Sequence, residues 1–169
     1  VEADDSILEL TKARLPWLVL ALFGGFISVH VLGIFEPVMD LHPELFFFTP
    51  LIAAMAGNVG VQSSAIIVQG LANNTIIGPV VERLLKELSL SLLNGVILSV
   101  ILLAGSYFLL GYEIHVGYTV SIALLSVIIM ASLIGTFIPI ILNKYGVDPA
   151  LATGPFITTS NDILGILTY

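Results

Sequence analysis

Long apolar runs fill most of this chain and limit its fold to helices that cross a membrane. They lie at approximately 15 to 35, 44 to 71, 84 to 110, 117 to 142 and 150 to 169. A helix needs roughly 20 apolar residues to cross a bilayer, and each of the first four runs is long enough. Transmembrane barrels show shorter, alternating segments instead. Only 10% of the residues are charged, whereas a soluble domain has about 25%. The sequence therefore predicts an all-α membrane protein, a bundle of five transmembrane helices.

The charged residues between the runs indicate an orientation. Basic residues occur before the first run and in every second loop after it, at Lys12, Arg14, Arg83, Lys86 and Lys144. The alternate loops carry acids instead, at Glu36, Asp40, Glu44 and Glu113. Cytoplasmic loops accumulate lysine and arginine, so we expect a cytoplasmic N-terminus and a C-terminus outside. The acidic loops would then gather cations at the outer surface.

We expect one membrane domain, preceded by a short polar segment. Residues 1–14 are predicted to form a cytoplasmic tail or linker helix, and residues 15–169 the transmembrane domain. The chain opens without an initiator methionine or the basic start of a signal peptide. This opening is typical of a segment cut from a longer protein, whose further domains would lie in the cytoplasm. The fifth run is expected to continue past Tyr169 if Asp162 lies at mid-depth.

One acid, Asp162, lies inside the fifth run and is the first candidate functional residue. A carboxylate at the bilayer centre costs about 3 kcal/mol, so it needs a partner. No lysine or arginine lies inside the apolar runs beyond their first turns. The partner of the Asp162 carboxylate must therefore be a mobile cation, a proton or a cage of hydrogen bonds. The purely structural alternative is a protonated carboxyl bonded to a neighbouring hydroxyl. On a helix, Thr158, Thr159 and Gly165 would share its face.

The second run is small and polar where a lipid-facing helix would be rich in leucine. Its small and amide residues share one broad helical face: Ala54, Gly57, Asn58, Val61, Gln62, Ser64, Ala65 and Gln69. The structural alternative is a packing seam between helices. The amides favour more than packing, because a buried amide needs a partner and its oxygen is a ligand for hard cations. We expect this face and that of Asp162 to line a cation passage.

A symmetric homodimer would place two copies of Asp162 beside one axis. Magnesium prefers octahedral oxygen coordination and keeps several of its waters when one or two carboxylates bind it. Asn58 and backbone carbonyls near Ala54 and Gly57 would contact those waters. Glu87 is predicted as an acid on the cytoplasmic side, paired with Arg83 at the interface. The alternative is that Glu87 lies deeper in the membrane, beside the exit of the cation passage.

Two stretches resemble the transmembrane domain of the MgtE magnesium channel family, which is related to a eukaryotic solute carrier family of magnesium transporters. They are PLIAAMAGNVGVQSSAIIVQGLA in the second run and DPALATGPFITTSNDILGILTY in the fifth. The resemblance implies a homodimeric, magnesium-selective channel in a prokaryotic plasma membrane, surrounded by lipid, with a central pore between the subunits lined by the second and fifth spans of both. Mg²⁺ is then the transported ion and not a catalytic cofactor, and no enzymatic activity is expected. Asp162 matches the family's pore aspartate, and Asn58 matches the asparagine of its Gly-Asn motif.

The chain departs from the family pattern at several points. Many relatives have Gly-Gly-Asn where this chain has Ala56, Gly57 and Asn58. Some carry Asn and Thr at the positions of Val61 and Ala65, so secondary polar contacts to the ion are fewer here. The family's cytoplasmic helical domain and paired regulatory modules have no counterpart in this sequence.

Two other functions remain open on the sequence. An exchanger coupled to H⁺ or Na⁺ would use Asp162 alternately for Mg²⁺ and the coupling ion. An intramembrane aspartic protease needs two cooperating aspartates, and only Asp162 lies well inside a run. A dimer would have to supply the second one.

Overall fold

The computed structural model describes residues 6–74 and 78–147, without the side chain of Met39, and the separate residues Gly154, Ile157, Thr159, Ser160 and Ile163. Regular structure in these residues is helical. The helices are α1 (Ile7–Ile34), α2 (Glu36–Leu41), α3 (Pro43–Phe46), α4 (Thr49–Ala72), α5 (Val80–Phe108) and α6 (Ile114–Lys144). Four segments are long and apolar enough to cross a membrane: α1, α3 with α4, α5 and α6. The predicted all-α membrane protein is confirmed, while most of the predicted fifth span lies outside the described residues.

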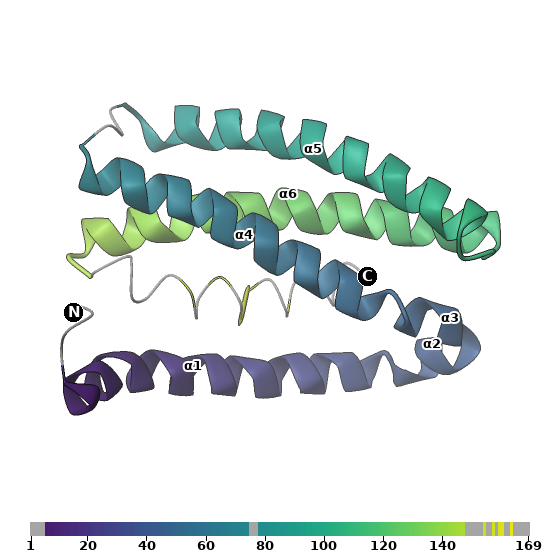
Figure 1. Cartoon of the computed structure of the whole chain (residues 1–169), viewed down its shortest axis with the longest axis horizontal. Coiled ribbons are helices and arrows are strands. Elements are labelled where there is room, and N and C mark those ends of the chain that lie inside the picture. Colours follow the sequence, from purple (N-terminus) through teal and green to yellow (C-terminus); the bar gives the residue numbers. More distant parts are fainter. Residues whose placement is uncertain are drawn as a thin grey trace.

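Three of the long helices pack as one group. Helix α6 lies against both α4 and α5, whereas α1 is drawn apart from this group and roughly parallel to it (Figure 1). The buried apolar core lies between α4 and α6, where Ile52 and Ala56 meet Ala123, Val127 and Ala131. Because α6 has neighbours on two sides, it carries much of the buried surface, while α5 and α1 expose broad apolar faces suited to lipid.

Two helix starts differ from the predicted boundaries for local reasons. A capping box starts α1 at Ile7, in which the Ser6 hydroxyl accepts from the Glu9 amide and the Glu9 carboxylate accepts from the Ser6 amide. The polar residues predicted as a tail or linker helix are thus helical from Ile7 and continue into the first span. The second run divides in two, because α4 begins at Thr49 with Pro50 in its first turn, where the missing N–H costs nothing.

Small residues let α4 and α6 approach closely. A Cβ atom at Gly135 of α6 would lie 2.5 Å from the carbonyl oxygen of Gly60 of α4 and 3.1 Å from its Cα. Gly95 of α5 has the same role against α6, where a Cβ would lie 2.7 Å from Leu125 Cδ1. Such contacts replace the hydrophobic effect in lipid, where association depends on close packing.

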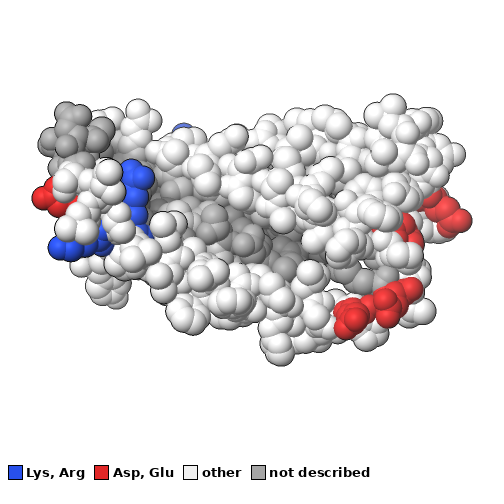
Figure 2. Space-filling model, turned by 60° about the horizontal axis from the view of Figure 1, so that its bottom comes forward, with Lys and Arg blue, Asp and Glu red and all other residues white. Residues whose placement is uncertain are grey.

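Basic side chains gather at one end of the helices. In Figure 2 they lie at one end of the face together with acidic atoms, and the opposite end carries acidic side chains without basic ones. Lys12 and Arg14 in the first turns of α1, Arg83 at the start of α5 and Lys144 at the end of α6 belong to the basic end. This three-dimensional separation matches the alternation of loop charges in the sequence.

Candidate functional site

An exposed stripe of small and amide residues runs along α4. Ala54, Asn58, Val61 and Ala65 are exposed and Gly57 is half-buried. The opposite face of the helix is the packed one, with Ile52, Ala56, Gly60, Ser63, Ser64 and Ile67 buried. Four of the five residues predicted on this helix as ion contacts therefore lie on one open surface, with Gly57 at its margin. Ser64, which the sequence placed in the same stripe, belongs instead to the packed side.

The composition of this stripe sets it apart from the other open faces. The exposed face of α5 consists of large apolar side chains such as Leu93, Ile97 and Val100, which lipid tails accommodate. Asn58 and Gln62 of α4 are exposed amides in a membrane-spanning helix. Amide groups in hydrocarbon lack hydrogen-bond partners and are costly there. The α4 stripe is therefore suited to water, hydrated ions or another protein surface.

The predicted fifth span is only partly described. Thr159 is helical and half-buried, and its side chain lies directly against Gly24 of α1, where a Cβ atom would overlap it. Asp162, Thr158 and Gly165 lie outside the described residues. Their predicted roles at the ion pathway stay predictions.

Glu87 is buried behind the α4 stripe at the junction of three helices. Its Oε1 atom accepts hydrogen bonds from Ser63 of α4 and Ser132 of α6, both at 2.6 Å. Its Oε2 atom lies 3.8 Å from Nη2 of Arg83, one turn earlier on α5. The Arg83 pair expected from the sequence is present, but the two serines are partners that sequence reasoning missed. Each of the two serines lies on a buried helix face together with other small hydroxyl residues, so the sequence did not single them out as partners of Glu87.

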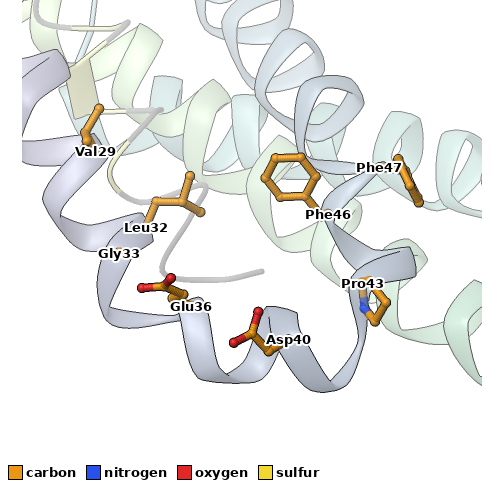
Figure 3. A pocket seen from close by; sticks show the side chains of 8 residues that line it. All are labelled: Val29, Leu32, Gly33, Glu36, Asp40, Pro43, Phe46 and Phe47. Atoms are coloured by element: carbon orange, nitrogen blue, oxygen red, sulfur yellow. The ribbon is translucent and has the colours of Figure 1, made fainter.

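A second acidic feature lies at the opposite end of the molecule. A pocket of about 480 Å³ is lined by Val29, Leu32, Gly33, Glu36, Asp40, Pro43, Phe46 and Phe47. Figure 3 shows Glu36 and Asp40 on neighbouring turns of α2, at the rim of this otherwise apolar hollow. Nearby, His42 Nδ1 lies 3.1 Å from Glu44 Oε1. These are the acids expected at the outer surface, and the structure gathers them where α1 gives way to α2 and α3.

Within the described residues, no group of three or more His, Asp and Glu side chains gathers to hold a metal ion. A cage built entirely from those side chains is therefore not seen in that part of the chain. The exposed stripe of α4 offers the side-chain amide oxygens of Asn58 and Gln62 instead, which suits contact with the waters of a hydrated ion.

Comparison with known proteins identifies the family. A family model described as a divalent cation transporter, MgtE, matches residues 49–169, which include α4, α5 and α6. The chain is 40% identical over 167 residues to the magnesium transporter MgtE of Bacillus subtilis (strain 168), covering 98% of this chain. It is 34% identical over 170 residues to the protein of that name from Thermus thermophilus, covering 100% of this chain. The chain spans 37% of the length of both relatives. It belongs to the MgtE family of divalent cation transporters, which are not enzymes.

Proposed function

We propose that two copies of this chain form a channel that conducts partly hydrated Mg²⁺ across the membrane. The observation that carries the proposal is the open α4 stripe, which combines small residues with Asn58 on a helix whose opposite face is fully packed. Small side chains leave room for a hydrated ion, and an amide oxygen accepts hydrogen bonds from its waters. A second copy related by a twofold axis would cover this stripe and enclose the passage between the subunits.

The ion and its ligands follow from chemistry and from the relatives. The relatives carry the name magnesium transporter, and magnesium is commonly held by one or two carboxylates with several waters retained. We assign Asp162 from each subunit to the ion, with Asn58 contacting its waters. We assign the remaining pore-lining positions to Ala54, Gly57, Val61 and Ala65 from α4 and to Thr158 and Gly165 from the fifth span. The sequence predicts Thr159 among them as well, but its side chain packs against Gly24 of α1.

The charge distribution supports a direction for the passage. The acidic end, with Glu36 and Asp40 at a pocket rim, would raise the local cation concentration at the entrance. The basic end would lie in the cytoplasm, as lysine and arginine at cytoplasmic loops require. Mg²⁺ would then move inward down its electrochemical gradient.

The test is Mg²⁺ flux into liposomes that contain the purified full-length protein. We expect Asp162→Asn to lower flux at least tenfold while the protein remains folded and dimeric, because the variant removes the charge that each subunit offers to the ion. Glu82→Gln is the matched control. It removes an exposed carboxylate from the first turn of α5, away from the α4 stripe and from the acidic end, and we expect flux within about twofold of the unmodified protein because salt screens such charges.

The same assay separates a channel from an exchanger. A channel passes Mg²⁺ without moving H⁺ or Na⁺ in the opposite direction, whereas a coupled exchanger moves its coupling ion in a fixed ratio to the Mg²⁺ that enters. Unchanged flux in Asp162→Asn would refute the assigned role of that residue, and an unmodified protein that passes no Mg²⁺ would refute the function itself.

A further inference from the structure

Glu87 connects three membrane-spanning helices through a single oxygen atom. The residue is 3% exposed. Ser63 and Ser132 donate to the same Oε1 atom at 2.6 Å, so α5, α4 and α6 meet at this carboxylate. These lengths are those of charge-assisted O–H···O⁻ bonds, which are roughly twice as strong as neutral ones. We call Ser63, Glu87 and Ser132 the serine–glutamate clamp.

The clamp is positioned to control the rotation of α4. Two kinds of contact already join α4 to α6. The apolar core packs Ile52 and Ala56 of α4 against α6, and Gly60 meets Gly135 without side chains that interlock. Ser63 lies one turn beyond Gly60 on the same packed face of α4, and its bond to Glu87 is directional. The clamp therefore adds a directional constraint on the rotation of α4 beside the glycine contact.

Rotation of α4 translates directly into displacement at the exposed stripe. Cα atoms lie about 2.3 Å from a helix axis, so a rotation of roughly 20° moves a Cα by about 0.8 Å and a side-chain atom about 6 Å from the axis by about 2 Å. Asn58 and Val61 lie on the side of α4 opposite Ser63. Displacements of this size exceed the difference of roughly 0.2–0.6 Å between the metal–oxygen distances of Mg²⁺ and Ca²⁺, so they are large enough to disturb discrimination between the two ions.

A small polar cavity beside the clamp leaves room for such a rotation. Its volume is about 70 Å³, enough for a few waters. Its lining includes Glu87, Gln62 of α4 and Asn94 of α5. Gln62 lies one turn from Asn58, so the cavity reaches the margin of the exposed stripe. Waters in this space can replace the serine donors when the clamp opens, which lowers the cost of rotation.

We infer that Glu87 is a positioning residue for ion selection: its bonds to Ser63 and Ser132 hold α4 at the rotation at which the stripe discriminates Mg²⁺ from larger divalent cations. The inference rests on the proposed channel function. Glu87 does not contact the ion itself, because it lies on the packed side of α4. Its charge is partly balanced by Arg83, 3.8 Å away.

The test measures the ratio of Mg²⁺ to Ca²⁺ flux in the same liposomes for the full protein. The ratio is independent of how much protein folds, so a loss of stability alone does not change it. We expect Ser63→Ala, Ser132→Ala and the double variant to lower the ratio by roughly tenfold, the equilibrium shift that one hydrogen bond to a charged group supports. Glu87→Gln keeps an oxygen that accepts both serine hydroxyls, so its ratio should fall by less than that of the double variant.

Two matched controls lie on the same helix as Glu87. Ser89→Ala removes an exposed hydroxyl that bonds only to the Leu85 carbonyl of its own helix, and Glu82→Gln removes an exposed acid from the first turn of α5. Both should keep the ratio of the unmodified protein within about twofold, because they touch neither the clamp nor the stripe.

The outcomes separate this inference from the proposed function. An unmodified protein that passes no Mg²⁺ refutes the channel. If it passes Mg²⁺ but prefers it no more than Ca²⁺, or if the clamp variants lower both fluxes in proportion, the clamp sets no selectivity and the inference fails. The inference also fails if Ser63→Ala and Ser89→Ala have the same ratio of Mg²⁺ to Ca²⁺ flux.

Discussion

Replacing Gly135 with alanine adds one carbon atom where α6 touches the backbone of α4. The new Cβ would lie 2.5 Å from the Gly60 carbonyl oxygen, whereas ordinary contact begins at 3.4 Å. The atoms it meets belong to backbone and cannot rotate away. Helix α4 must therefore move by about 0.9 Å, or the backbone must distort, to accommodate the methyl group.

Two opposing effects set the magnitude. Overpacking of a close contact costs about 1–3 kcal/mol, while alanine is about 1 kcal/mol more favourable than glycine within a helix. A control substitution at Gly105 of α5 separates the cost of overpacking from the gain in helix propensity, because a Cβ there meets nothing within 4 Å. Gly105→Ala should keep or raise stability, and Gly135→Ala should be less stable than this control by about 1–3 kcal/mol.

Thermal unfolding in detergent and Mg²⁺ flux together measure the effect. At about 2–4 °C per kcal/mol, Gly135→Ala should melt roughly 2–12 °C below Gly105→Ala. Its flux should fall as well, because the displaced helix carries the exposed stripe, and the flux of Gly105→Ala should not change. A Gly135→Ala protein that melts at or above the control would refute the close backbone contact on which the packing of α4 depends.

Two further predictions concern the surfaces of α4 and α1. The chain contains no cysteine, so Val61→Cys on the exposed stripe should react with a charged thiol reagent, while Ile97→Cys on the apolar face of α5 should not. Equal labelling rates would contradict a water-accessible stripe. Gly24→Ala should lower the melting temperature by a few degrees because its Cβ overlaps Thr159. Gly25→Ala is the control, with open space around it, and matching melting temperatures would exclude that contact.

Several predictions made from the sequence match the structure because they depend on the length and mean hydropathy of a continuous segment. Four apolar runs appear as α1, α4, α5 and α6, since length and hydropathy alone decide whether a helix can cross a bilayer. The Ser6 capping box shows the limit of hydropathy, because it starts α1 in a polar stretch. Asp162 stays a prediction, since it lies outside the described residues.

The amino-acid sequence by itself determined the membrane class, four of the five predicted spans and the gathering of basic residues at one end, because each is a property of consecutive residues. The tertiary structure decided which side of α4 is packed, which buries Ser64 and leaves Asn58 and Ala65 open. It also brought Glu87 to Ser63 and Ser132, which lie 24 and 45 positions away. Helical periodicity defines the faces of a helix, but only contacts with other helices select the face that is buried.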